Sequence, residues 1–269
     1  ESENTEEAAA EPVESVREVP HKSMPLARRT LENVDSFLLA KHLTLVECEL
    51  FVAIQSREFM DKAWLASNKE EVAPNIVAMT NRFNEVSTWV ATAILQRTTV
   101  KERRKVLQKF IDVAWQCKEL NNFNGVFEIV SGLNSSAVHR LKKTWEIPAQ
   151  RRDQYNQLAT MVASNDNFKA LKDKLFTTNP PCVPFLGVFQ TYLTFIEDAN
   201  SNTGSHGLIN FEKRRKLAAI ISRMQMYQRT PYSSEGVVHD IKEALMRLPT
   251  LTSDELFTLS LEREPREPG

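Results

Sequence analysis

Residues 184–200, PFLGVFQTYLTFIEDAN, carry a stripe of small and polar side chains that ends in a carboxylate. Successive side chains of a helix are about 100° apart, so Gly187, Thr191, Thr194 and Asp198 fall on one arc. This arc has none of the lysines and arginines that are typical of a merely solvated helix face. The small polar face is therefore available for a function other than solvation.

The opposite arc of the same stretch is apolar. Its side chains recur at three and four residues, which is typical of a helix that packs on a core. They are Phe185, Val188, Phe189, Tyr192 and Ile196. One face can thus hold the helix on the protein body while the other face acts.

Turn-forming residues on both sides predict that this helix is one arm of an αα-hairpin. Residues 179–184, NPPCVP, form a rigid extended entry that fixes where the helix starts. Residues 197–207, EDANSNTGSHG, form a polar loop, and a second helix is expected to begin near 209–211. The hairpin either projects from the body or packs into a bundle with a solvated outer face, and periodicity alone leaves both arrangements open.

Motifs for covalent chemistry are absent. The chain has 7 glycines, and they form neither a Walker A loop nor a G-x-G-x-x-G fingerprint. The sequence contains no H-E-x-x-H and no G-x-S-x-G elbow. We therefore expect no nucleotide site, no metal site and no cofactor, and a protein that makes and breaks no covalent bond.

Composition indicates an ordinary globular chain of 269 residues with a net charge of −1. This charge balance favours neither nucleic acid nor an anionic membrane as a partner. Arg140, Lys142 and Lys143 have only Trp145 nearby to stack a base, which also argues against nucleic-acid binding. Three cysteines without a signal peptide predict a reducing, cytoplasmic location, and no apolar run is long enough for membrane insertion.

The chain divides into an acidic lead-in and one helical domain. Residues 1–33 are rich in glutamate and poor in large apolar side chains, so we expect a disordered segment or linker there. Helical periodicity runs from about 34 to 265, strand-like alternation is scarce, and residues 266–269 form a tail. The fold class expected is all-α, with many helices in one domain.

A helix junction is expected within residues 132–145, GLNSSAVHRLKKTW. Gly132 and Asn134 can end one helix, and Ser135 or Ser136 can cap the next. This assignment needs no function for Asn134.

Five blocks of the sequence together resemble the catalytic domain of Ras-type guanine nucleotide exchange factors (RasGEF). They are residues 43–64 (LTLVECELFVAIQSREFMDKAW), 121–145 (NNFNGVFEIVSGLNSSAVHRLKKTW), 179–198 (NPPCVPFLGV to LTFIED), 208–218 (LINFEKRRKLA) and 260–265 (SLEREP). The blocks follow the family order and cover roughly 34–265. The resemblance implies an all-α, bowl-shaped bundle from which a helical hairpin protrudes into a partner GTPase.

The resemblance assigns roles to both faces of the hairpin helix. Phe185, Phe189 and Tyr192 are expected to anchor the hairpin, while Thr194 matches the position that intrudes on the magnesium site of the GTPase. Asp198 matches an acid near the phosphate-binding loop, although glutamate is commoner there. The catalytic set implied in this way is Thr191, Thr194, Glu197, Asp198 and Asn200.

The resemblance also implies a partner-binding set on the body. Asn134 matches an asparagine that hydrogen-bonds an acidic residue of switch 2 of the GTPase. The other positions implied to contact the partner are Ser136, Phe127, Phe168, Thr80, Asn81 and Lys216. Relatives often have tyrosine at Phe168 and some have arginine at Asn81, so a hydroxyl bond and an ion pair are in doubt at these two positions.

The activity implied is exchange of GDP for GTP on a Ras-subfamily small GTPase, whose nucleotide-free form is bound most tightly. Two alternatives stay open: a non-catalytic helical module that binds a GTPase, and a GTPase-activating domain with Arg97 or Arg229 as its arginine finger. Membrane recruitment is expected through the lipidated GTPase or through regions outside this chain. The sequence does not identify which GTPase is served.

Overall fold

The computed structural model of the chain describes residues 31–163, 168–204 and 207–266. Within these residues the secondary structure is helical apart from two isolated β-bridges, so the prediction of an all-α fold is confirmed. Residues 1–30 of the expected disordered lead-in lie outside the described residues. Helical structure begins earlier than residue 34, because Leu31–Asn33 form a 3₁₀ turn (η2) and Leu31 packs against the core.

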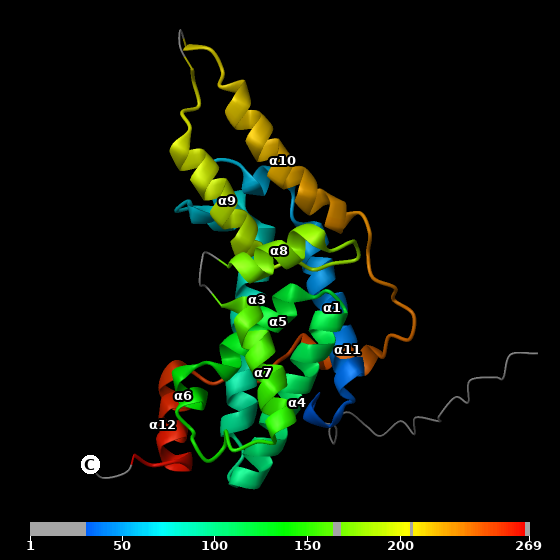
Figure 1. Ribbon diagram of the computed structural model, residues 1–269, viewed down its shortest axis with the longest axis vertical. Coiled ribbons are helices and arrows are strands. Elements are labelled where there is room, and N and C mark those ends of the chain that lie inside the picture. Colours follow the sequence, from blue (N-terminus) through cyan, green and yellow to red (C-terminus); the bar gives the residue numbers. More distant parts are fainter. Residues whose placement is uncertain (1–30, 164–167, 205–206, 267–269) are drawn as a thin grey trace, which may run out of the picture.

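The body and the hairpin are built from fifteen helical segments in the described residues (Figure 1). After η2 come α1 (Ser36–Ala53), η3 (Ser56–Phe59), η4 (Ala63–Leu65), α2 (Lys69–Val72), α3 (Pro74–Leu95), α4 (Val100–Glu119), α5 (Phe123–Leu133), α6 (Ser136–His139), α7 (Ala149–Val162), α8 (Lys169–Thr177), α9 (Leu186–Ala199), α10 (Phe211–Gln228), α11 (His239–Leu245) and α12 (Ser253–Arg263).

Local sequence signals set several of these helix starts. Thr99 caps α4 in a capping box with Glu102, and Thr252 caps α12 in the same way. α3 begins at Pro74, because proline lacks an N–H that the first turn would leave without a partner. Ser135 stands at the N-cap of α6, but its buried hydroxyl makes no hydrogen bond.

Two hydrophobic clusters form the core. The first, here called the lower core, packs the buried faces of α1, α3, α4, α5 and α12. The second, here called the upper core, lies nearer the hairpin and joins the ends of α1 and α3 to α8, α9 and α10. The half-buried Phe127 of α5 packs against both clusters. α5 therefore links the body to the base of the hairpin.

The hairpin is tied to the body at its root. An isolated parallel bridge pairs Asn122 with Val183, and the Phe123 amide donates to the Val183 carbonyl at 2.9 Å. Where α10 returns to the body, the side chain of Gln228 donates to the carbonyls of Phe51 and Ile54, both at 2.9 Å. These bonds fix where the chain enters and leaves the hairpin.

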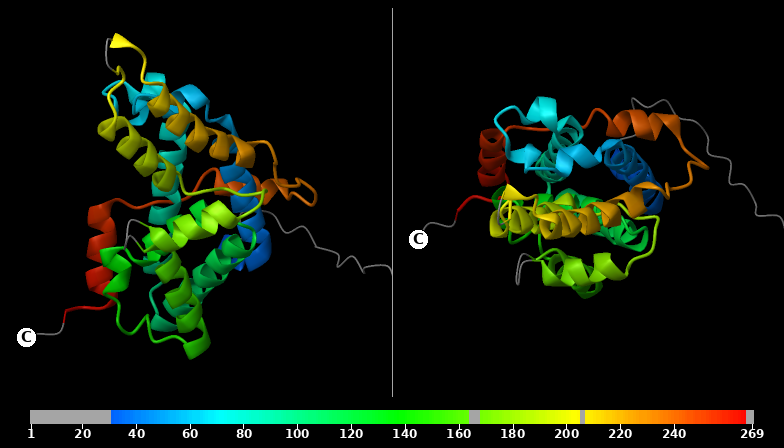
Figure 2. Two further views of the ribbon diagram at one scale, coloured as in Figure 1. Left: turned by 45° about the horizontal axis from the view of Figure 1, so that its top comes forward. Right: turned by 90° about the horizontal axis from the view of Figure 1, so that it is seen from above.

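The two arms, α9 and α10, project together from one end of the body (Figures 1 and 2). Asn210 caps α10, since its side chain accepts a 3.0 Å hydrogen bond from the Lys213 amide. The connecting residues are drawn together by the Thr203–Ile209 bridge. The projecting alternative is therefore correct for this hairpin.

Candidate functional site

α9 presents the two faces that its sequence predicts. Val188 and Phe189 are buried in the upper core, while Asp198 is exposed on the other side. Thr191 and Thr194 are half-buried. The Thr191 hydroxyl donates to the Gly187 carbonyl at 2.7 Å.

The Thr194 hydroxyl has no hydrogen-bond partner among the described residues. Asn200 follows the last turn of α9, and its side-chain amide donates to the Ile196 carbonyl at 2.9 Å. Within the stripe, the side chains of Thr191 and Asp198 are thus bonded, whereas the Thr194 hydroxyl is bonded to none of the described residues.

Tyr192 leans over α8, where its ring lies 5.8 Å from the Phe176 ring and 4.5 Å from the Lys172 ammonium. Phe176 also makes an edge contact with Phe189 at 6.5 Å. The expected anchor residues of α9 thus pack on α8 and on the upper core. The apolar face carries the arm, as its spacing indicates.

An aromatic cluster fills the junction between the hairpin and the body. Phe127 of α5 stacks on Phe185, which precedes α9, with ring centroids 3.9 Å apart and planes 8° apart. Phe168 lies 5.8 Å from Phe127 and 6.0 Å from Phe185. Phe83 of α3 completes the cluster at 5.7 Å from Phe127 and 5.8 Å from Phe185.

All four rings of this cluster are half-buried, so their outer edges form an apolar floor beside α9. Phe168 holds its place with a left-handed backbone, φ 59°, directly before α8. The structure thus brings together two expected partner-binding residues, Phe127 and Phe168, with the expected anchor Phe185. Sequence reasoning missed Phe83, although it lies four residues after the buried Met79 and three before the buried Val86.

Asn134 lies exposed at the end of α5, next to the exposed Ser136 at the start of α6. The Tyr155 hydroxyl of α7 donates a hydrogen bond to the Asn134 side-chain carbonyl. Burial raises the pKa of Tyr155, and the nearby positive charge of Arg152 opposes this increase, so the hydroxyl stays protonated as a donor. This bond occupies the Oδ1 atom of Asn134 and fixes the side-chain orientation, so the two N–H donors of its amide group remain available.

The remaining expected contact residues are also at the surface. Thr80 and Asn81 are exposed on α3, and the Thr80 hydroxyl donates to the Ile76 carbonyl at 2.8 Å. Lys216 is exposed on α10. The candidate fingers of the alternative GTPase-activating assignment, Arg97 and Arg229, follow α3 and α10 and belong neither to the stripe nor to the aromatic cluster.

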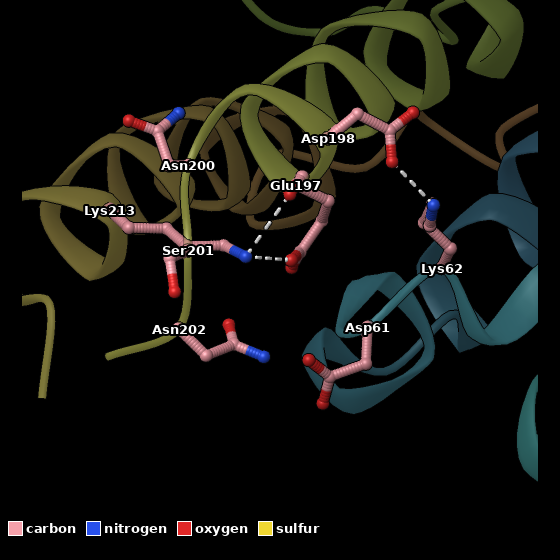
Figure 3. A pocket seen from close by; sticks show the side chains of 8 residues that line it. All are labelled: Asp61, Lys62, Glu197, Asp198, Asn200, Ser201, Asn202 and Lys213. Carbon is pink, nitrogen blue, oxygen red and sulfur yellow. Dashed lines mark hydrogen bonds and ion pairs between the residues drawn. The ribbon is translucent and has the colours of Figure 1, made fainter. Parts of the chain in front are cut away.

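The two neighbouring acids at the end of α9 have different surroundings (Figure 3). The Glu197 carboxylate lies 2.5 Å from the Lys213 ammonium of α10, and its side chain is only 6% exposed. The Asp198 carboxylate is 57% exposed and lies 2.6 Å from the ammonium of Lys62, which belongs to the turn before η4. Little of Glu197 is thus open to a partner in this conformation, in contrast to Asp198.

These four charged residues line a polar cavity of about 570 Å³ between the hairpin and the turn at 61–62 (Figure 3). Asp61, Asn200, Ser201 and Asn202 complete its wall. Sequence reasoning missed the burial of Lys213. The signal was present, because Lys213 lies four residues before the buried Leu217 on the same helix face.

Two glutamate side chains, those of Glu47 and Glu128, are fully buried. The Asn124 amide is 2.7 Å from Glu128 of α5 and 3.4 Å from Glu47 of α1. Burial raises the pKa of both carboxyl groups, and the negative charge of Glu47 raises that of Glu128 further. The pKa of Glu128 is therefore raised well above its ordinary value, because burial and the negative charge of Glu47 act in the same direction.

Among residues 31–163, 168–204 and 207–266, no three His, Cys, Asp or Glu side chains are grouped so that they could hold a metal ion. No helix in these ranges is long and apolar enough to cross a bilayer. All three cysteines are buried, free thiols. The side chains described at this site offer hydrogen bonds, charged groups and apolar surface.

Residues 38–215 match the family model of the RasGEF domain. Together with the helical body and the projecting hairpin, this match defines the class of protein: the chain belongs to the RasGEF family. The resemblance seen in the sequence blocks is confirmed.

Curated relatives agree with this assignment. The chain is 42% identical over 91% of its length to Ras guanine nucleotide exchange factor Y of Dictyostelium discoideum, and covers 16% of that protein. It is 38% identical over 88% of its length to Ras-specific guanine nucleotide-releasing factor 2 of Danio rerio, and covers 19% of it. It is 39% identical over 87% of its length to Ras guanine nucleotide exchange factor J of Dictyostelium discoideum, of which it covers 29%. The chain thus spans less than a third of these relatives.

Proposed function

We propose that this domain is a guanine nucleotide exchange factor for a Ras-subfamily small GTPase. The observation that carries the proposal is a RasGEF sequence match that covers α9 and ends in the first turns of α10, so that it takes in the small polar stripe and the half-exposed aromatic floor beside it. The names of the relatives support the same activity.

In this proposal, α9 and the aromatic cluster contact different parts of the GTPase. α9 enters beside the nucleotide, so that Thr194 crowds the magnesium position and Asp198 approaches the phosphate-binding loop. The aromatic cluster receives switch 2, and the Asn134 amide donates to an acidic side chain on it. This division is supported by the exposed Asp198, the partner-free Thr194 hydroxyl and the Tyr155 bond that orients Asn134.

The energetic requirement on the interface is large. If the GTPase binds GDP with a dissociation constant of about 10 pM, the binding free energy is about −15 kcal/mol. The exchange factor must bind the nucleotide-free form comparably well, because each ligand weakens the other by the same factor. Such an interface buries roughly 2,000 Å² or more in total. The hairpin and the floor together offer a surface with two separate contact regions.

Release of fluorescent GDP from purified Ras, Rap and Ral tests the proposal. We expect this domain to accelerate release from at least one of them. We also expect a stable complex with that GTPase in EDTA, and its dissociation when excess GDP and magnesium are added. A complex that is indifferent to nucleotide, without accelerated release, would instead support the non-catalytic binding module.

A further inference from the structure

The outer half of the hairpin has one polar tie to the body. Among the described residues from 194 to 216, the only hydrogen bond or ion pair to the body joins the Asp198 carboxylate to the Lys62 ammonium at 2.6 Å. The root of the hairpin differs, because Gln225 bonds Ser56 at 2.8 Å and Tyr227 bonds the Leu175 carbonyl at 2.5 Å. A projecting arm held mainly at its root can tilt, and Lys62 lies where a tilt would be resisted.

The turn that carries Lys62 is held in an unusual conformation. Asp61 and Lys62 both have left-handed backbones, with φ of 50° and 55°. A non-glycine residue in this region persists only where its surroundings impose it. Buried Phe59 on one side and buried Trp64 on the other anchor the turn in the body. The Lys62 ammonium is therefore presented from a fixed point.

The two arms of the hairpin are joined to each other next to Asp198. Glu197, the neighbour of Asp198, is bound to Lys213 by a buried ion pair that joins α9 to α10. Lys213 also donates to the Glu197 carbonyl at 3.3 Å. A restraint on Asp198 therefore acts on both arms of the hairpin, as the placement of these side chains shows (Figure 3).

We propose that Lys62 is a positioning residue that latches the outer hairpin to the body through Asp198 and so sets the tilt at which α9 meets the GTPase. The proposal rests on the proposed exchange function for its effect on rate, but not for its effect on the hairpin. Because Asp198 is also the acid assigned to the phosphate-binding loop, the same carboxylate serves the free domain and the complex in turn.

The test compares Lys62→Met with Lys242→Met. The control pair, Lys242 with Glu49, has the same 2.6 Å separation and similar exposure, 34% and 62% against 36% and 57%, but lies on the body. Amide hydrogen exchange of peptides covering 194–204 and 207–213 reports the hairpin, and fluorescent GDP release reports the activity. An exposed ion pair contributes up to about 1 kcal/mol, so we expect Lys62→Met to speed hairpin hydrogen exchange about two- to fivefold.

We expect the same variant to slow GDP release by a similar factor at subsaturating concentrations of the domain, with most of the loss overcome at saturation. Lys62→Arg should preserve both properties, and Lys242→Met should change neither. Adding Lys62→Met to Asp198→Asn should produce no further increase in hairpin hydrogen exchange, because the tie is already broken.

Unchanged hairpin hydrogen exchange in Lys62→Met would overturn the latch. Faster GDP release in this variant would also overturn it, since Lys62 would then mask Asp198 from the GTPase. If the unsubstituted domain releases no GDP from any GTPase, the exchange function has failed, and the hydrogen-exchange comparison alone still decides whether Lys62 restrains the hairpin.

Discussion

The ammonium of Lys213 and the carboxylate of Glu197 lie 2.5 Å apart with side chains only 3% and 6% exposed, so one buried ion pair joins the two arms of the hairpin. The second carboxylate oxygen of Glu197 has no hydrogen-bond partner. A buried pair of this kind adds little net stability against an apolar replacement, but removing one member leaves a buried charge without compensation. The pair thus enforces the spacing of α9 and α10.

We therefore expect Glu197→Gln to destabilise the domain by about 3–5 kcal/mol, because Lys213 keeps its charge in a buried site. Urea unfolding measures this change. Glu212→Gln is the matched control, since Glu212 forms an exposed pair with Arg215 on the same hairpin. A change below about 0.5 kcal/mol for Glu197→Gln would show that the site is hydrated and that the pair does not brace the hairpin.

Part of this site could be predicted from the sequence. The spacing of apolar residues from 185 to 196 placed the two faces of α9, and the polar residues from 197 to 207 placed the turn. The partners of the acids could not be predicted in the same way. Lys62 is 136 residues from Asp198 in the chain, and only the folded body brings the turn at 61–62 beside the hairpin.

Thr194→Arg tests the functional face of α9. Bulk and positive charge at the half-buried Thr194 should abolish exchange if this residue faces the magnesium site. The melting temperature should change little, because surface substitutions usually cost less than about 0.5 kcal/mol. GDP release and thermal unfolding on one preparation measure both, with Thr98→Arg, at an exposed position between α3 and α4, as control. Unfolding by Thr194→Arg, or exchange at the parent rate, would mean that the faces of α9 are assigned wrongly.

Phe189→Ala tests the opposite face. Phe189 is 1% exposed and contacts Phe176, so truncation should destabilise the domain by about 3–5 kcal/mol. Exchange should fall because the hairpin loses its seat, and a higher concentration of GTPase should restore part of it. Thr194→Arg should show no such rescue. Equal behaviour of the two variants would contradict the separation of an anchoring face from an acting face.

Asn134→Ala should lower exchange about ten- to a hundredfold, as expected for the loss of a hydrogen bond to a charged group, which contributes about 1.5–3 kcal/mol. Tyr155→Phe removes only the hydroxyl that orients Asn134, so we expect a smaller loss in the same direction. If Asn134 merely ends α5, the melting temperature should fall in Asn134→Ala while the activity per folded molecule is preserved.

The role of Tyr155 could not be predicted from the sequence for a related reason. Asn134 ends a helix in both the structural and the functional assignment, and nothing in residues 132–145 indicates which side chain will bond it. Tyr155 comes from α7, which the fold lays beside the end of α5. The aromatic cluster is similar, since its four rings come from four separate segments that each show only local periodicity.

Glu128→Gln should stabilise the domain and reduce the dependence of its stability on pH. The folded-state pKa of Glu128 is raised by burial and by the charge of Glu47, whereas the pKa of a free glutamate is about 4.3. Above that value the unfolded chain loses a proton that the folded domain retains, so this group lowers stability as pH rises toward its folded pKa.

Glutamine at 128 removes the titrating proton but keeps an oxygen for the Asn124 amide and offers N–H donors to Glu47, one of whose oxygens lacks a partner. The unfolded chain is ionised at this position at pH 8 and less completely so at pH 5, so we expect the gain in stability from Glu128→Gln to be larger at pH 8 than at pH 5. Urea unfolding at both pH values measures it. Glu119→Gln, at an exposed glutamate of α4, should show neither effect. A gain that is equal at both pH values, or a loss at pH 8, would show that Glu128 is ionised in the folded domain and held by the nearby charge of Arg82.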